Sequence, residues 1–224
     1  MVRRGRFFFV LLGLCRSSLN LGLIERPLAI GFLWSLFGGD WSTSLAVAVF
    51  YELFWLDAIP AGTYIPPHLA ASTTAALALV SHFGLTHPAQ IAVPLALSMP
   101  LSWLGARLEG ALREWQNRGY SAILQWARHS ADPDLPPRLV LRAVLTSALF
   151  SWLFFFSCIL TLAVVTDLCL LRFGPQLAAS RLTWTPLLLA AGLGGVLSLR
   201  LRRAQALFAA GAVVVILFSF AGVF

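Results

Sequence analysis

The sequence predicts an all-α integral membrane protein with about seven transmembrane helices, a re-entrant half-helix, and broken helices in the N-terminal half. Three observations support this prediction: 59% of the 224 residues are hydrophobic, 11% are charged, and the mean hydropathy is +0.83. Soluble domains carry about 25% charged residues, and a soluble chain of this length needs more polar side chains to cover its surface. The composition therefore excludes an ordinary soluble domain.

Seven apolar runs come close to the roughly 20 residues that a helix needs to cross a bilayer. We expect them to form transmembrane helices at about 6–24, 41–59, 66–83, 88–106, 143–166, 182–199 and 204–223. The first run has the basic start of a signal peptide, but Arg16 interrupts it and no A-x-A-like cleavage site follows. This run is therefore expected to be retained as a helix.

A shorter apolar run, RPLAIGFLWSLFGGD, lies at residues 26–40 between the first two long runs. It begins with Arg26-Pro27 and ends with Gly38-Gly39-Asp40, and it is too short for a comfortable crossing. We expect it to enter and leave the membrane on one side as a re-entrant half-helix, a form that is tolerated where protein or water surrounds it.

All 16 basic residues are arginines, and the net charge is +7. Such a charge on a soluble domain suggests nucleic acid, but these arginines lie at the ends of apolar runs, which indicates membrane topology and no nucleic-acid partner. Basic residues concentrate in cytoplasmic loops, so residues 107–140 are expected to form a cytoplasmic amphipathic helix and loop, with Arg172 and Arg181 outside. This segment divides an N-terminal membrane half, 1–106, from C-terminal membrane helices, 141–224.

The cysteines and histidines give no sign of a metal site. Cys15, Cys158 and Cys169 lie in or beside apolar runs without CxxC spacing, as small core residues do. His82 and His87 flank a turn without an acid or thiol nearby, which is weak support for metal binding. The sequence also has no Gly-rich phosphate loop. We therefore expect no metal, no cofactor and no catalytic residue.

Three carboxylates, Asp40, Glu52 and Asp57, lie within or beside apolar runs. An ionised carboxylate inside a bilayer is costly unless it is paired or faces water, so such residues indicate functional sites. The stretch IPAGTYIPPHLA follows, and its prolines and Gly62 predict a broken backbone, which is tolerated only beside a cavity or within protein. We expect a polar cavity lined by Asp40, Glu52, Trp55 and residues 61–68, suited to a sugar or another polyhydroxyl solute.

Structural roles for these residues remain open at this point. Asp40 could simply cap the helix that follows it, and Glu52 could form a bridge with Arg16 or Arg26. Asp57 could sit in interfacial water. The tryptophans Trp34, Trp41, Trp55 and Trp103 could belong to a membrane-interface belt, and we prefer this interpretation for Trp34 and Trp103.

An ordered set of residues resembles the N-terminal half of the enzyme IIC subunits of the mannose/fructose/sorbose class of the bacterial phosphotransferase system. Those proteins show a comparable RPL, a short run to GD, an ELIWLG-like helix and a VPxGxxIPPD-like break. The matching pieces, between about residues 25 and 75, are Arg26-Pro27-Leu28, Gly31, Gly39-Asp40, Glu52-Leu53-x-Trp55-Leu56, Pro60-x-Gly62 and Ile65-Pro66-Pro67. Their order and spacing carry the resemblance, because no single piece is specific.

The resemblance implies a multi-pass permease subunit of the bacterial inner (cytoplasmic) membrane, which binds and translocates a hexose-type sugar and is not itself an enzyme. Such subunits pair with a IID membrane subunit, here expected as a higher oligomer of the IIC–IID pair, while cytoplasmic IIA and IIB phosphocarriers bring phosphate to the sugar. The expected substrate site comprises Asp40, Glu52, Trp55, Gly62, Pro66, Pro67 and His68.

Two positions depart from the family's pattern, since Asp57 replaces the usual Gly after Trp-Leu and His68 replaces the acid after Pro-Pro. These changes favour one alternative, a regulatory or structural membrane subunit of a degenerate sugar phosphotransferase system. A second alternative is a secondary transporter coupled to protons through Glu52, which would take up solute without partner subunits.

Overall fold

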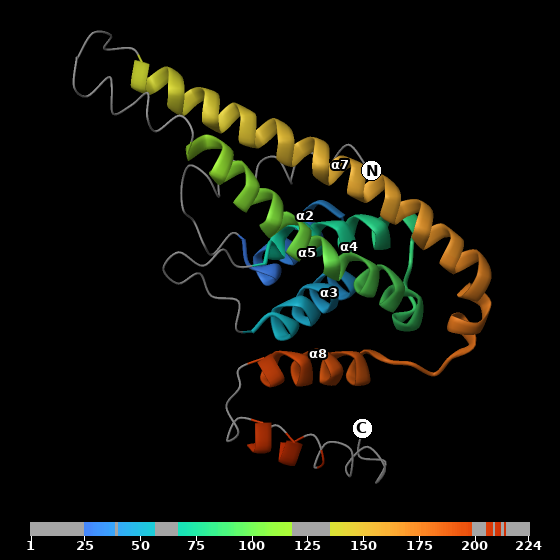
Figure 1. The fold of residues 1–224 in the computed structure, drawn as a ribbon. Helices are drawn as coiled ribbons and strands as arrows, with labels where there is room; N and C mark the ends of the chain where they lie inside the picture. The colour runs from blue at the N-terminus through green and yellow to red at the C-terminus, as the bar shows by residue number, and fades with distance from the viewer. Residues whose placement is uncertain are drawn as a thin grey trace.

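The computed structural model describes residues 25–38, 40–56, 67–117, 135–198, 205–207, 209–211 and 213. All regular secondary structure in these ranges is helical, as the sequence predicts. The helices are α2 (Pro27–Gly38), α3 (Trp41–Phe54), α4 (Leu69–Phe83), α5 (Pro88–Asn117), α7 (Leu135–Ala179) and α8 (Trp184–Ser198) (Figure 1).

Helices α2 and α3 form a tight antiparallel hairpin. Pro27 occupies the first position of α2, where its missing N–H costs nothing, and Asp40 caps α3 by accepting a hydrogen bond from the Thr43 N–H at 3.1 Å. A Cβ atom added at Gly31 would lie 2.3 Å from the Ala48 Cβ atom, so the two backbones touch at a point where only glycine fits.

The direction of α2 differs from the expectation of a re-entrant segment. The short helix is present, but Arg26 at its start contacts Glu52 near the end of α3, whereas the residue after Gly39 caps the start of α3. The two ends of the 26–40 run therefore lie at opposite ends of α3, and the run does not return to the side where it begins. The cause is the packing of α2 on α3, which is held at Arg26–Glu52 and at Gly31–Ala48 and continues to the Asp40 cap.

Helix α4 is the centre of the bundle. Eleven of its fifteen residues are buried, and it contacts α2, α3, α5 and α7. Its first half is rich in Ala, Ser and Thr, whose small side chains let neighbouring helices approach closely. Near its other end, the Trp34 indole N–H donates to the Ser81 hydroxyl at 3.0 Å and joins α2 to α4.

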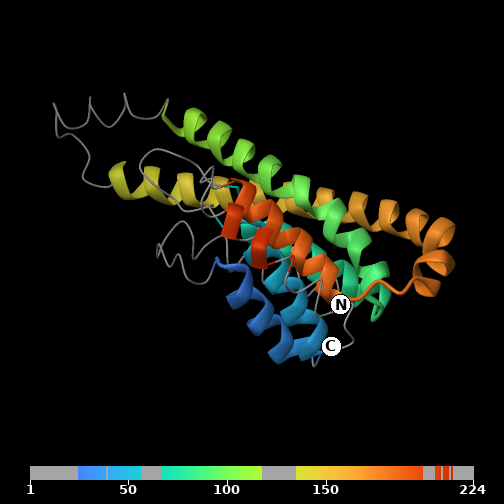
Figure 2. The same ribbon diagram turned by 90° about the horizontal axis from the view of Figure 1, so that it is seen from below.

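Helices α5 and α7 run antiparallel, side by side (Figures 1 and 2). Two glutamines of α5 join them near both ends: Gln90 donates to the Gly174 carbonyl at 3.2 Å, and Gln116 donates to the Ser147 hydroxyl at 2.7 Å. Pro94 and Pro100 lie inside α5 without ending it. The helix also continues past Arg107 to Asn117, so the predicted span at 88–106 and the start of the predicted cytoplasmic helix are one continuous helix.

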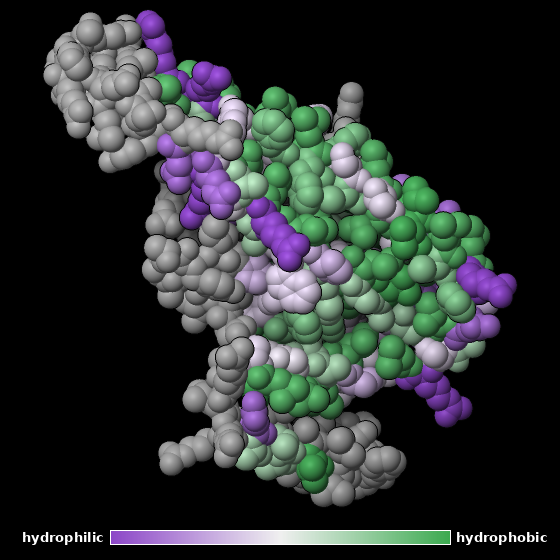
Figure 3. Space-filling model, in the orientation of Figure 1, coloured by the Kyte–Doolittle hydropathy of each residue, from purple (hydrophilic) through white to green (hydrophobic). Residues whose placement is uncertain are grey.

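Two helices are long and apolar enough to cross a membrane by length and composition, at Pro88–Asn117 and Pro137–Ala179. Between Arg142 and Asp167, α7 carries no charge over a length of about 36 Å, and Figure 3 shows a broad hydrophobic surface with hydrophilic side chains beyond both ends. The other helices have 12 to 15 residues, shorter than a full span. The count of about seven spans stays a prediction, and the runs at 6–24 and most of 204–223 lie outside the described residues.

Helix α8 packs on α3 through glycines. A Cβ atom added at Gly195 would lie 2.0 Å from the Leu53 carbonyl oxygen, and one at Gly194 would lie 3.2 Å from the Phe54 ring. The end of α8 thus lies against the end of α3. Because Glu52 and Trp55 flank these α3 residues, α8 helps to fix the part of α3 that carries predicted site residues.

Candidate functional site

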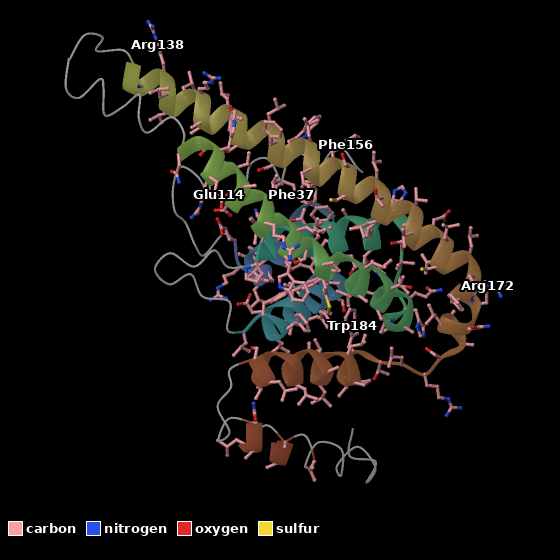
Figure 4. All side chains as sticks on the ribbon, in the orientation of Figure 1. Phe37, Glu114, Arg138, Phe156, Arg172 and Trp184 are labelled. Atoms are coloured by element: carbon pink, nitrogen blue, oxygen red, sulfur yellow. The ribbon has the colours of Figure 1, made fainter. Side chains whose placement is uncertain are left out.

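The described arginines are distributed unequally between the two ends of the bundle. The end where α2 and α4 begin and α3 finishes carries five described arginines, and we name it the arginine-rich end: Arg26, Arg107, Arg113, Arg138 and Arg142. The opposite end carries Arg172 and Arg181, and Figure 4 shows Arg138 and Arg172 at the two ends of α7. Since basic residues favour the cytoplasmic side, we expect the arginine-rich end to face the cytoplasm.

Glu52 is held at this end by two contacts. Its Oε1 atom lies 3.4 Å from the Arg26 guanidinium, and its Oε2 atom accepts a hydrogen bond from the Leu28 N–H at 3.3 Å. The second contact satisfies an amide in the first turn of α2, where the helix dipole favours negative charge. The bridge to Arg26 that the sequence left open is therefore present. A carboxylate has about four acceptor sites, so Glu52 can still accept hydrogen bonds from a ligand.

Trp55 lies one turn after Glu52, at the end of α3. It is only 7% exposed, and its indole Nε1–H has no hydrogen-bond partner among the described residues. Its ring makes an edge-to-face contact with the ring of Trp103 from α5, with centroids 5.9 Å apart and an interplanar angle of 82°. Glu52 in the last turn of α3 contacts the start of α2, whereas Trp55 just after this helix contacts α5, so the two side chains lie at the same end of the bundle.

Pro67 and His68 precede α4 and lie against the same part of α5. Pro67 is buried and His68 is half-buried. The His68 backbone N–H donates to the Ser102 carbonyl at 2.8 Å, and a Cβ atom added at Gly105 would lie 2.9 Å from the His68 Cβ atom. His68 and Trp55 therefore both border the segment of α5 around Trp103. Two other predicted site residues, Gly62 and Pro66, lie outside the described residues, as does Asp57.

Asp40 is not part of this arrangement. It is exposed at the start of α3, where it acts as the helix cap. Twelve residues of helix separate it from Glu52, which corresponds to about 18 Å along the axis. The structure thus brings Glu52, Trp55, Pro67 and His68 to one end of the bundle and leaves Asp40 at the other.

A buried group of hydroxyls was missed in the sequence. The Tyr51 hydroxyl donates to the Leu95 carbonyl at 2.8 Å and lies 2.5 Å from the Ser98 hydroxyl. In α4, the Ser72 and Thr73 hydroxyls donate to the Leu69 carbonyl. The usable signal was the run ASTTA at 71–75 and the four-residue spacing of Ser98 and Ser102, which places both on one helix face. These hydroxyls place polar groups in the buried interior formed by α3, α4 and α5.

The residues that could ligate a metal are dispersed. Within the described ranges, no three His, Cys, Asp or Glu side chains come together as potential ligands. His82 is exposed at the end of α4 and makes an edge contact with the Phe83 ring, while His87 precedes α5. The absence of a metal site stays a prediction for the chain as a whole.

Comparison with known families extends the resemblance beyond the N-terminal half. A family model described as the PTS system sorbose-specific IIC component matches residues 7–199. No curated protein matches the chain at a significant level. The matched range contains α2 to α5, α7 and α8, and with them the described candidate site residues.

Proposed function

Because the chain belongs to the family of PTS sorbose-specific IIC components, we propose that it binds a hexose-type sugar and moves it across the bacterial inner membrane for phosphorylation by a IIB partner. IIC components are membrane permease subunits of a sugar phosphotransferase system, and they function in a complex with other subunits. The proposed partners are a IID membrane subunit and cytoplasmic IIA and IIB phosphocarriers. In this proposal the chain positions the sugar and catalyses no step itself.

The observation that carries this proposal is the arrangement at the arginine-rich end. Glu52 offers a charged acceptor, Trp55 offers a buried indole N–H without a partner among the described residues, and His68 borders the same segment of α5. A sugar hydroxyl is both donor and acceptor, so a carboxylate and an N–H at the same end of α3 can bind different hydroxyls of one sugar. The proposed site comprises Glu52, Trp55, Pro67 and His68 together with Gly62 and Pro66.

The position of the site suits its role. By the distribution of arginines, this end faces the cytoplasm, where a IIB phosphocarrier would meet the sugar. Asp40 lies at the opposite end, and in this proposal it would contact the sugar, if at all, only on the external side. A rigid-body movement of the short, polar-ended helices against the long α5–α7 pair would expose the sugar first to one side and then to the other.

The experiment is sugar uptake and phosphorylation in membranes that contain the chain together with IID, IIA, IIB and the general phosphotransferase proteins. Labelled sorbose, mannose and fructose are the probes, and phosphoenolpyruvate is the phosphate donor. We compare the native chain with Glu52→Gln and with a matched control, Glu114→Gln, an exposed glutamate near the end of α5. We expect Glu52→Gln to lower sugar phosphate formation by at least tenfold and the control to leave it unchanged.

Two outcomes would contradict the proposal. No sugar phosphate from the native chain, despite stable assembly with IID, would favour the regulatory subunit. Uptake that needs a proton gradient and proceeds without partner subunits would favour the proton-coupled transporter. Asp40→Asn, tested in the same membranes, shows whether the external end contributes.

A further inference from the structure

A role at the membrane interface does not account for all the contacts of Trp103. It is 60% exposed and precedes Arg107 by about one turn of α5, which suits the interface belt that the sequence suggests. However, its ring also makes an edge-to-face contact with Trp55, whose indole N–H is buried and has no partner among the described residues. The exposed ring and the buried N–H come from different helices and meet at the arginine-rich end.

We propose that Trp103 and Trp55 form a sugar subsite at the cytoplasmic end of the pathway, in which the sugar stacks on Trp103 and accepts a hydrogen bond from Trp55 Nε1. This inference rests on the proposed function and adds a residue, Trp103, that the sequence assigned to the lipid interface. The ligand class is a pyranose or furanose sugar, which has an apolar C–H face and hydroxyls at its rim.

The chemistry of the two rings supports this assignment. A buried polar N–H without a partner is uncommon in native structures and calls for an explanation, and a bound hydroxyl would supply the missing acceptor. Aromatic faces carry negative charge density and attract the slightly positive edges of neighbouring groups, so the Trp103 ring suits the C–H face of a sugar. Glu52, three residues before Trp55 at the same end of α3, would accept from another hydroxyl of the sugar.

In this proposal the subsite opens by a movement of one side chain. Trp103 is the more exposed of the two rings, at 60% against 7% for Trp55, and its movement would give a sugar hydroxyl access to the Trp55 N–H. The backbone beneath is fixed, because the His68 N–H is bonded to the Ser102 carbonyl and Gly105 lies against His68. With this backbone contact kept, only the Trp103 side chain would have to move to admit and release a sugar.

The test is equilibrium binding of labelled sorbose and mannose to the purified complex of the chain with IID in lipid nanodiscs, without IIB. The variants are Trp103→Ala, Trp103→Phe and Trp55→Phe, the last of which keeps a ring but removes the N–H. The matched control is Trp115→Ala, an exposed tryptophan further along the same helix. We expect Trp103→Ala and Trp55→Phe to raise the sugar Kd by about 3- to 10-fold, and Trp103→Phe and Trp115→Ala to change it by less than twofold.

The outcomes separate this inference from the proposed function. If the native complex binds and phosphorylates sugar while Trp103→Ala and Trp115→Ala bind it equally well, the inference is overturned and the proposed function stands. If Trp103→Ala lowers only the amount of protein inserted in the membrane, Trp103 is an interface residue and the inference is again overturned. If the native complex binds neither sugar and no sugar phosphate forms from sorbose, mannose or fructose, the proposed function fails and the subsite fails with it.

Discussion

Helices α7 and α4 are both apolar, but they face different surroundings. Apart from a few side chains such as Phe155 and Ile159, which pack against Ala71 and Ala75 of α4, α7 exposes its large residues: Leu141, Leu145, Leu149, Leu160, Val164 and Leu168. Helix α4 is enclosed by four helices and consists largely of Ala, Ser and Thr over its first half. Because lipid tails are as apolar as leucine, a lipid-facing surface can consist of large apolar side chains. Contacts between helices instead need small residues and matched hydrogen bonds.

The two helices also differ in the polar side chains that they and their neighbours carry. Helix α7 is charged only toward its ends, whereas the helices around α4 bury hydroxyls and a tyrosine and carry the partly exposed Arg26–Glu52 pair. Inside the bilayer, polar side chains are stable only where other protein groups or water satisfy them. The short helices therefore offer the polar groups that the proposed sugar site needs, and α7 is suited to contact with lipid.

The largest difference in stability is expected when one leucine in each helix is truncated. Leu77 of α4 is 1% exposed, and Leu149 of α7 is 56% exposed. We expect Leu77→Ala to lower the free energy of unfolding by about 2–5 kcal/mol, because it leaves a cavity in a packed interior. Leu149→Ala should change it by less than about 0.5 kcal/mol, because lipid fills the space. Equilibrium unfolding in mixed micelles measures both, and similar losses would show that α7 is covered by protein.

A second substitution tests the close contact between α2 and α3 at Gly31 and Ala48. Gly31→Ala places a Cβ atom 2.3 Å from the Ala48 Cβ atom and 2.9 Å from the Ser44 carbonyl oxygen. We expect a loss of about 1–3 kcal/mol from overpacking. Adding Ala48→Gly should recover part of this loss, because it removes one of the two clashes. The matched control is Gly174→Ala in α7, where the nearest atom would be 4.0 Å away. Equal thermal stability of all these variants would contradict the close packing of α2 on α3.

The smallest effect concerns the Arg26–Glu52 pair, which is partly exposed. We expect Arg26→Gln and Glu52→Gln each to destabilise the protein by about 1–2 kcal/mol, less than a fully buried pair because water screens it. The double variant should lose less than the sum of the two single losses, because each single variant leaves one unpaired charge and the double variant leaves none. A double-mutant cycle in the same micelles measures this coupling. Strict additivity would show that the contact contributes nothing to stability.

Much of the fold could be predicted from local patterns. The charge-free run between Arg142 and Asp167 predicts the core of α7, and Gly38-Gly39-Asp40 predicts both the end of α2 and the cap of α3. The direction of α2 could not be predicted, because it depends on Gly31 fitting against Ala48 and on Arg26 reaching Glu52. The continuation of α5 past Arg107 was also missed, since the charged residues beyond it indicate an amphipathic segment but not whether the helix breaks before it.

The candidate site, too, could be predicted from the sequence only in part. The sequence alone determined that this is a membrane protein of the IIC type, because composition and the order of motifs are local properties of the chain. It also predicted Glu52, Trp55 and His68 as site residues, and this stays a prediction. The tertiary structure decided that Asp40 lies about 18 Å from Glu52 along α3, and that Trp103 lies against Trp55. Residues far apart in sequence meet only when helices pack, and this packing depends on many small side chains that fit together at once.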